Sequence, residues 1–488
     1  MIAEEIRAKY QVVIGLEVHA QLATVSKIFS PDPNSFGDDP NTNINAISLG
    51  HPGVMPLLNK KAVEYAIMMG VACNCDITRF GFFDRKNYFY PDLPKGYQIT
   101  QDKTPICKTG HLDVELSDGT LTKVQINRIH LEEDAGKLIH MEGVSDSQVD
   151  LNRAGVPLIE IVTEPCIHSS KAASAFLAEI RKIVRYLHIC DGNMEEGSLR
   201  CDANVSVMLT NADQFGKKVE VKNMNSIKNV SRAIEHEIER QIDLLEEGGE
   251  IISETRTFDV ISGKTFGMRT KEELNDYRYF PEPDLSPIEV SEEWLAEIKS
   301  RMSILPNDLR IELESEYGLS ANDTALLTEQ KELAFYFKDI CKHTSSNKSV
   351  VNWLMGPIKS YLKEKNLALG EFPLSHEQIA GIIALIDKGV ISFSAASQQL
   401  FPYMLDHPEE SIDEAIHHLN IVQDSDSDSI QRVINEVISD LPEKVTEYNK
   451  GKKGLIGMFM GEVMKKTNGK VDPKITNKLL RETLENQN

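Results

Sequence analysis

The sequence is short of cysteine and has no long apolar run, and each shortage excludes a class of protein. Seven cysteines are scattered over 488 residues, which is typical of reduced thiols in the cytoplasm and not of a disulfide-rich secreted domain. No run approaches the roughly 18 apolar residues of a membrane span. The N-terminal sequence MIAEEIRAKY is charged and lacks the apolar centre of a signal peptide. We therefore expect a cytoplasmic protein with no membrane segment.

Positive charge is also scarce. The chain has 53 Lys and Arg residues against 75 Asp and Glu residues, a net charge of -22, which argues against indiscriminate binding to nucleic acid. Residues 450–481 are the exception, with nine basic residues and only two acidic ones. Such a local excess is typical either of a nucleic-acid footprint or of a solvated helical face. Within it, the candidates for phosphate contacts are Lys465, Lys466 and Lys470.

The familiar motifs for nucleotide binding and for an activated serine are missing. The sequence contains no G-x-x-x-x-G-K-[ST] loop, no G-x-G-x-x-G turn, no G-x-S-x-G elbow and no Gly/Ser-rich amidase-like stretch. If the protein handles ATP, it does so on a less familiar scaffold. A self-sufficient hydrolase is disfavoured, because no nucleophile is evident.

Three segments are predicted to be strands with acids on one face. Residues 12–22 (VVIGLEVHAQL) alternate strictly, which predicts a strand with Glu17 and His19 about 7 Å apart on its polar face. Residues 124–137 (VQINRIHLEEDAGK) also alternate, and their change of parity near 127–128 predicts a bulge or a barrel corner. Residues 157–162 (PLIEIV) place Glu160 in an apolar run, where a carboxylate is costly to bury unless it is paired or binds a metal.

These acids allow two interpretations. They are either the solvated ends of acidic strands or a site for a hard divalent cation, since oxygen ligands dominate the set. The candidate ligands are Glu17, His19, Glu160 and one of Glu132 and Glu133.

A second candidate region is residues 82–98 (FFDRKNYFYPDLPKGYQ), where Arg85, Lys86 and Lys95 lie among aromatic residues. This pattern fits either a packed loop or a surface that contacts phosphate, since loops often carry function.

The order of the predicted elements indicates an α+β protein. Residues 1–290 form a large β-rich unit with amphipathic helices at 169–186 and after Asn225 or Ser226. Prolines in residues 276–287 (DYRYFPEPDLSP) mark its end, and the periodicity from Glu292 onward is helical. We expect a helical domain over 291–408 and a small helical tail domain over 409–488.

Several motifs together resemble the B-subunit family of the tRNA-dependent amidotransferases, the GatB/GatE family. They are GLEVHAQL, FDRKNYFYPDLPKGYQ, HLEEDAGK, VDLNRAGVPLIEIVTEP, DGNMEEGSLRCDANVSV and DYRYFPEPDL, with GLIGMFMGEVMKKTNGKVDPKITNKLL in the tail. The resemblance runs from about Val12 to the C-terminus. It implies a cradle domain, a helical domain and a mobile tail.

The resemblance also implies an activity. Members of the family bind Glu-tRNA(Gln) or Asp-tRNA(Asn), phosphorylate the side-chain carboxylate with ATP, and admit ammonia to attack the acyl phosphate. They work as a ligase in a heterotrimer with an amidase (A) subunit, which hydrolyses glutamine, and a small C subunit. The opposing hypothesis is a tRNA-binding adaptor without catalysis, in which the acidic strands are only structural.

The resemblance implies roles for the candidate residues as well. Glu17, His19, Glu133 and Glu160 would be catalytic and hold Mg²⁺ or a similar ion, with Glu132 and Glu133 as alternatives at one position. Arg85, Lys86 and Lys95 would bind ATP phosphates or line the ammonia route. Lys465, Lys466 and Lys470 would contact tRNA. Many members of the family bind zinc through cysteines in the segment equivalent to residues 30–49, which here has none, so we expect no structural zinc.

Overall fold

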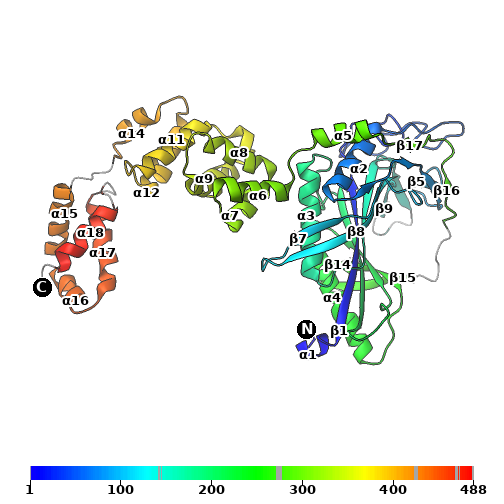
Figure 1. Cartoon of the computed structure of the whole chain (residues 1–488), viewed down its shortest axis with the longest axis horizontal. Helices are drawn as coiled ribbons and strands as arrows, with labels where there is room; N and C mark the ends of the chain where they lie inside the picture. Colours follow the sequence, from blue (N-terminus) through cyan, green and yellow to red (C-terminus); the bar gives the residue numbers. More distant parts are fainter. Residues whose placement is uncertain are drawn as a thin grey trace. The chain divides into compact units, whose positions relative to one another are not determined.

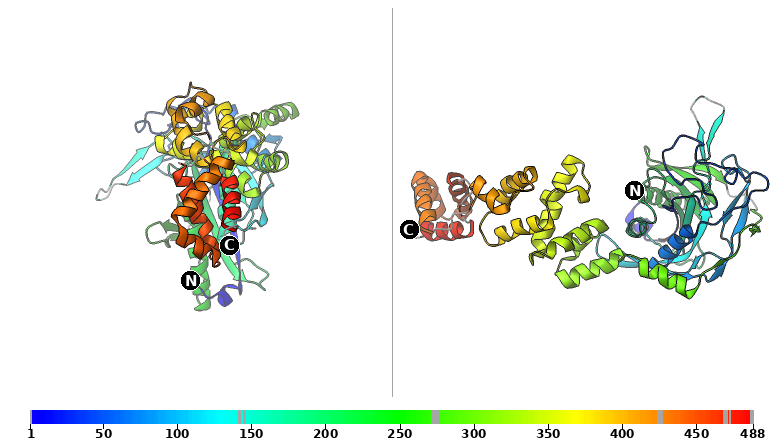
Figure 2. Two further views of the ribbon diagram at one scale, coloured as in Figure 1. Left: turned by 90° about the vertical axis from the view of Figure 1, so that its left-hand side faces the viewer. Right: turned by 90° about the horizontal axis from the view of Figure 1, so that it is seen from above.

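The computed structural model describes residues 2–140, 143, 146–270, 277–422, 427–467, 471 and 473–485 (Figure 1). Contacts between Cα atoms divide the chain into two compact units, Met1–Pro306 and Asn307–Asn488. Unit 1 is built around a large sheet and unit 2 is helical (Figure 2), which confirms the α+β class. The three-domain division at residues 290 and 408 stays a prediction.

The centre of unit 1 is a ten-stranded sheet in the order β15-β14-β13-β12-β1-β11-β8-β6-β2, with β7 paired to β8. The strand bounds are Tyr10–Gln21 (β1), Asp76–Ile77 (β2), Cys107–Lys108 (β6), His111–Glu115 (β7), Leu121–Glu133 (β8), Pro157–Thr163 (β11), Leu199–Leu209 (β12), Val219–Met224 (β13), Glu254–Asp259 (β14) and Lys264–Thr270 (β15). The three predicted acidic strands are therefore β1, β8 and β11, and they are neighbours.

The bulge predicted in β8 is present. Val162 of β11 pairs with Arg128, but Thr163 pairs with Ile126, so Asn127 is the extra residue. An extra residue exchanges the two faces of a strand. The acidic end of β8 therefore keeps its polar side chains on the same face as those of β1 and β11.

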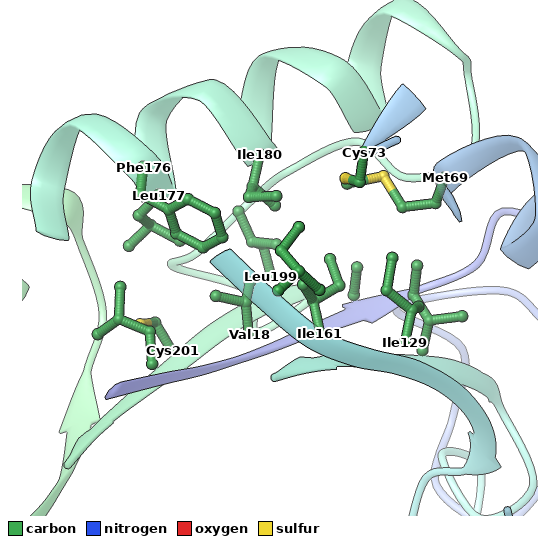
Figure 3. Packing of buried hydrophobic residues seen from close by; sticks show 14 of the residues in the cluster. Val18, Met69, Cys73, Ile129, Ile161, Phe176, Leu177, Ile180, Leu199 and Cys201 are labelled. Carbon is green, nitrogen blue, oxygen red and sulfur yellow. The ribbon is translucent and has the colours of Figure 1, made fainter. Parts of the chain in front are cut away.

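Helices cover one face of this sheet. They are α2 (Lys60–Ala72), α3 (Ser170–Tyr186) and α4 (Ile227–Glu246). Figure 3 shows Phe176, Leu177 and Ile180 of α3 above Val18 of β1 and Ile161 of β11. Burying each such side chain contributes about 1.5–3 kcal/mol. Because successive side chains of a strand point to opposite faces, an apolar helix-facing set leaves the polar set of the same strands on the other face.

Local sequence explains where these helices begin. The Ser169 hydroxyl accepts a hydrogen bond from the amide of Ala172, and the Ser226 hydroxyl accepts one from the amide of Asn229. Each side chain satisfies an amide that lacks a partner within the helix. Of the two predicted caps of α4, Ser226 is therefore the one used.

A smaller sheet lies beside the acidic ends of β1, β8 and β11 and helps to form the site described below. Its order is β16-β4-β5, with bounds Asp84–Asn87 (β4), Tyr97–Thr100 (β5) and Phe280–Pro281 (β16).

The other elements of unit 1 are α1 (Glu4–Arg7), β3 (Phe80–Gly81), β9 (Lys137–His140), β10 (Ser147–Asp150), β17 (Ile288–Glu289) and α5 (Glu292–Arg301). Although α5 follows residue 290, Arg301 pairs with Glu64 of α2 at 3.2 Å.

The described elements of unit 2 are all helical. They are α6 (Pro306–Tyr317), α7 (Ala321–Leu327), α8 (Lys331–Cys341), α9 (Asn347–Trp353), α10 (Lys359–Lys365), α11 (His376–Asp387), α12 (Phe393–Ala395), α13 (Phe401–Asp406), α14 (Ile412–Leu419), α15 (Ser427–Asp440), α16 (Pro442–Asn449), α17 (Ile456–Lys466) and α18 (Pro473–Glu485), with short π- or 3₁₀-helical segments at 354–358, 369–371, 396–400 and 453–455. Helices α15 to α18 share their own core, which includes Ile434, Phe459 and Leu480. In the part of the chain that is described, no helix is long and apolar enough to cross a membrane.

Candidate active site

The sheet register places three functional side chains in a row. His19 of β1 pairs with Glu160 of β11, and Glu160 pairs in turn with His130 of β8. Directly opposed residues of adjacent antiparallel strands have their Cβ atoms about 4.5–5.5 Å apart. The carboxylate of Glu160 therefore lies between two imidazoles, and both are on the face that the helices leave uncovered.

Glu132, two residues after His130 on the same face, completes this first group. The Nε2 atom of His19 is 3.5 Å from Glu160 and 3.9 Å from Glu132, and the Nε2 atom of His130 is 3.3 Å from Glu160 and 3.5 Å from Glu132. Thr100 of β5 donates a hydrogen bond to Glu132 at 3.2 Å. Two imidazoles and two carboxylates thus share one small space.

The charges of this group shift its protonation equilibria. Burial alone would lower the pKa of His130, but Glu132 and Glu160 outweigh burial and raise the pKa to about 9. Burial would also lower the pKa of His19, but the contact with Glu160 outweighs burial and raises it. Burial would raise the pKa of Glu160, yet the two imidazoles hold it well below its usual range. Glu160 is therefore an anion, and protonated His130 is a cation beside it.

A second acidic group lies on the other side of β1. Glu17 of β1 pairs across the sheet with Asp202 of β12, and Glu220 of β13 is close enough for one oxygen of each to lie within 4.8 Å of the others. The Nζ atom of Lys222 is 2.5 Å from Asp202 and 2.9 Å from Glu220. Burial and the nearby Glu160 and Glu220 raise the pKa of Glu17, as expected where like charges gather.

Both groups line one cavity of about 520 Å³, within the roughly 300–1,000 Å³ range of small-molecule sites. Its remaining lining is mostly polar or aromatic, and Lys86, Arg128, Arg200 and Lys222 supply positive charge. Asp134 is buried beside it and accepts hydrogen bonds from Gln21 and Arg200, each at 2.8 Å. Burial would raise the pKa of Asp134, but Arg200 and Arg153 lower it, so this carboxylate stays ionised.

The donor set of the first group fits a hard divalent cation. One atom each of His19, Glu132 and Glu160 lies within 4.8 Å of the other two. Octahedral Mg²⁺ holds its ligands at about 2.1 Å, which places adjacent ligands about 3 Å apart. Small side-chain movements would therefore bring the three atoms to that spacing. Two carboxylates and one imidazole also match the preference of Mg²⁺ or Mn²⁺ for oxygen-rich sites.

The placement of Glu133 and Glu17 differs from the predicted single ligand set. Glu133 points to the other face of β8, where its carboxylate binds the Lys95 ammonium and accepts a hydrogen bond from the amide of Ile99 at 2.8 Å. The reason is the strand period of two, which separates adjacent side chains. The structure thus places Glu132, and not Glu133, beside His19 and Glu160, and it places Glu17 with Asp202 and Glu220. Which glutamate is the ligand stays a prediction.

Only one of the three predicted phosphate-binding cations lines the cavity. Lys86 does so, whereas Lys95 is held by Glu133. Arg85 makes a two-pronged contact with the buried Glu282, each bond 2.7 Å long, and a third bond to Asp284 at 3.0 Å. We therefore interpret Arg85 and Lys95 as structural cations of the packed loop and keep Lys86 as the phosphate-binding candidate.

Four further residues of the two groups, His130, Asp202, Glu220 and Lys222, were not among the predicted site residues. A signal for three of them existed. His130 and Glu132 repeat the spacing of Glu17 and His19, and KVEVKN places Glu220 and Lys222 on one face. What the sequence does not contain is the register, which alone shows that these faces meet.

The structure describes two of the three lysines predicted to contact tRNA. Lys465 and Lys466 end α17, and both are exposed. The Lys466 ammonium lies 2.7 Å from Asp440 of α15. Lys470 lies outside the described residues.

The segment expected to lack zinc is held by hydrogen bonds. Buried Asp32 accepts hydrogen bonds from the hydroxyls of Ser30 and Ser48 and from the amide of Asn45. The Lys27 ammonium, also buried, donates to the carbonyl of Asn43 at 2.7 Å. The absence of zinc stays a prediction.

Comparison with known proteins places this chain in a family. A family model described as the GatB/GatE catalytic domain matches residues 12–296, and one described as the GatB domain matches residues 335–484. The chain belongs to the GatB/GatE family.

Its relatives carry a common name. A protein of Trichodesmium erythraeum is 47% identical and one of Geotalea daltonii is 48% identical; each alignment covers 98% of this chain and 99% or 100% of the relative. A protein of Thermosynechococcus vestitus is 46% identical, and the alignment covers 97% of this chain and 96% of that protein. All three are named as the B subunit of aspartyl/glutamyl-tRNA(Asn/Gln) amidotransferase.

Proposed function

We propose that this chain is the B subunit of an aspartyl/glutamyl-tRNA(Asn/Gln) amidotransferase, a glutamine-dependent carbon–nitrogen ligase. It would use ATP to activate the side-chain carboxylate of Glu-tRNA(Gln), Asp-tRNA(Asn) or both, for amidation to Gln-tRNA(Gln) or Asn-tRNA(Asn). The observation that carries the proposal is the row of His19, Glu160 and His130 across three adjacent strands, in a cavity that also holds cations for phosphate.

The proposed reaction has two steps. First, an oxygen of the substrate carboxylate bonds to the γ-phosphorus of ATP while the bond to ADP breaks. Then the nitrogen of ammonia bonds to the activated carbonyl carbon, phosphate leaves with the bonding electrons, and the nitrogen gives up a proton. The first step brings anions together, so it needs charge neutralisation and positioning more than a protein nucleophile. This requirement agrees with a site rich in charged groups.

The residues of the chain would divide this work. His19, Glu132 and Glu160 would hold Mg²⁺ or a similar ion, which when bound neutralises charge on phosphate and carboxylate oxygens. His130 fixes the orientation of Glu160 through its Nε2 atom, 3.3 Å away. Lys86, which lines the same cavity, would contact the phosphates. We further propose that the chain acts in a heterotrimer, with an amidase (A) subunit supplying ammonia and a small C subunit.

A transamidation assay on the complex co-expressed with the A and C subunits tests the proposal. His19→Ala should abolish ATP-dependent amidation of aminoacyl-tRNA, while the glutaminase activity of the complex and the affinity for tRNA persist. The matched control is His51→Ala, an exposed imidazole of unit 1 outside the cavity lining, which should keep full activity. If His19→Ala amidates tRNA at the parent rate, the cavity is not the catalytic site, and the adaptor hypothesis takes its place.

A further inference from the structure

One wall of the cavity differs in character from the rest. Most of the lining is charged or amide-bearing, but Tyr88, Tyr277 and Tyr279 lie side by side on it and form what we call the tyrosine wall. The rings of Tyr88 and Tyr277 have their centroids 6.3 Å apart and those of Tyr277 and Tyr279 are 6.0 Å apart, both pairs in edge-to-face geometry. The Lys86 ammonium lies 4.7 Å from the centre of the Tyr277 ring.

The wall is held in place by backbone contacts. Asn87, at the end of β4, donates from its amide to the carbonyl of Tyr277 at 2.9 Å and from its side chain to the carbonyl of Arg278 at 2.8 Å. Phe280, which follows Tyr279, is in register with Arg85 of β4. Two segments almost 200 positions apart in the chain are therefore fixed to each other at this wall, which gives the rings a defined position before any ligand binds.

Core packing does not account for these rings. The main hydrophobic core of the described residues of unit 1 includes Tyr97 at its edge but none of the three wall tyrosines. Tyr279 is 37% exposed, and burial raises its pKa to about 12, so its hydroxyl is neutral at physiological pH. A row of partly open aromatic rings inside a charged cavity offers a surface for a flat, uncharged group.

We propose that the tyrosine wall is an adenine-binding subsite. The inference rests on the proposed function, which brings two adenine-bearing ligands to this cavity: ATP and the 3′-terminal adenosine of tRNA that carries the amino acid. A base gains affinity by stacking on an aromatic side chain, because every base has a flat π-face. The phosphates or ester of the same ligand would then extend from the wall toward Lys86 and the first acidic group.

Binding measurements on the assembled complex distinguish an adenine subsite from a structural wall. The probes are MgATP and magnesium tripolyphosphate, which carries the phosphates without a base. Tyr279→Ala should weaken ATP binding about tenfold, which corresponds to about 1.4 kcal/mol, and leave tripolyphosphate binding unchanged. Tyr279→Phe keeps the ring and should bind ATP like the parent. Tyr90→Ala, which removes an exposed tyrosine outside the cavity lining, should also have no effect.

A second arm identifies the source of the adenine. Two RNA hairpins that mimic the acceptor stem are compared, one ending in CCA and one ending in CC. If the terminal adenosine uses the wall, the parent prefers the CCA hairpin about tenfold and Tyr279→Ala loses that preference, while ATP binding is normal. Either pattern supports the subsite.

The inference is overturned if Tyr279→Ala binds both ATP and the CCA hairpin as the parent does. It is also overturned if tripolyphosphate binding falls as much as ATP binding, because the substitution has then disturbed the whole cavity. If the parent complex itself binds neither ATP nor RNA, the proposed function fails together with the inference. Parent binding therefore separates the two failures.

Discussion

Glu160 is the residue on which the first group depends, because it faces an imidazole on each side. The pKa of His130 is raised to about 9 and that of His19 is also raised, so protonation of these imidazoles places positive charge beside Glu160, where a bound divalent cation would otherwise supply it. Metal binding must therefore displace protons, as is general for histidine and carboxylate ligands. The positions of Glu132 and Glu133 relative to this group make a sharp comparison possible.

We predict that Glu132→Gln and Glu133→Gln fail in different ways. Glu132→Gln removes a charged ligand and should weaken Mn²⁺ binding, measured by electron paramagnetic resonance, by at least about 10–100-fold, the range typical for loss of a group that only supports a metal ligand. Glu133→Gln breaks a buried contact with Lys95, which typically costs about 3–5 kcal/mol of stability, and should leave Mn²⁺ affinity close to that of the parent. The opposite result would restore Glu133 as the ligand.

Lys27 predicts a pH dependence of stability. Burial lowers its pKa from 10.5 to about 8 in the folded chain, while the unfolded chain keeps the higher value. Between those two values the unfolded state binds more protons, so this group makes stability rise with pH, and the gain is complete above the unfolded pKa. We expect the urea midpoint of the parent to rise from about pH 8 to about pH 10 relative to that of Lys27→Met. Parallel curves for the two proteins would contradict the pKa shift.

At the scale of elements, the period of side chains along a strand can be predicted from the sequence, but the register between paired strands cannot. The alternation of β1 and the bulge of β8 follow from side-chain period alone, because one face of each strand must be apolar to meet a helix. Strand partners do not follow from period, since any two strands of equal polarity could pair. The sequence therefore predicts one group of Glu17, Glu133 and His19. In the structure Glu17 lies opposite Asp202 of β12, and the Glu133 carboxylate contacts the amide of Ile99 on the other side of β8.

The roles of charged residues in the 82–98 segment are harder to predict from the sequence than those of the strand residues. Arg85 and Lys95 have the composition of a phosphate site, but their partners Glu282 and Glu133 come from distant parts of the chain. A local window of sequence does not contain the carboxylate that neutralises a cation. Lys86, the neighbour of Arg85 in β4, reaches the cavity because adjacent side chains of a strand point to opposite sides.

The contact between Arg85 and Glu282 should be essential to the small β16-β4-β5 sheet. Arg85→Met would leave the Glu282 charge buried without its main partner and should cost about 3–5 kcal/mol. The double variant Arg85→Met, Glu282→Leu should lose less than the sum of the two single variants, because no charge remains buried. Chemical denaturation of the four proteins measures this coupling. Additive losses would show that the pair is not an energetic unit.

At the scale of the whole molecule, an acidic chain must bind a polyanion if the proposed function holds. The basic residues of α17 and α18 would meet that need, but they are not equivalent. The Lys466 ammonium already contacts Asp440 at 2.7 Å, whereas Lys465 is exposed at the end of the same helix. A phosphate would have to compete for Lys466.

We therefore predict that Lys465→Ala weakens tRNA binding more than Lys466→Ala does. A lost phosphate contact should lower the slope of log affinity against log salt by about 1, and Lys465→Ala should show that change. The rate at saturating tRNA should not change, because the acidic groups lie in unit 1 and these lysines in unit 2. Equal salt slopes in the parent and both variants would make the tail a solvated surface, and a lower saturated rate would assign it a role in catalysis.

The arrangement of β1 has a consequence for how this gene can change. Alternate codons of residues 12–22 specify the helix-facing core and the candidate active site, so a single-codon deletion there would exchange the two sets of side chains. Fold and activity would be lost in one event. Function in this strand is thus protected by the same selection that preserves folding. We expect insertions to be tolerated where they shift neither face of a strand, as in the largely exposed turn at 210–217 between β12 and β13. Lineages should accordingly differ in loop length long before they differ in the spacing of Glu17 and His19.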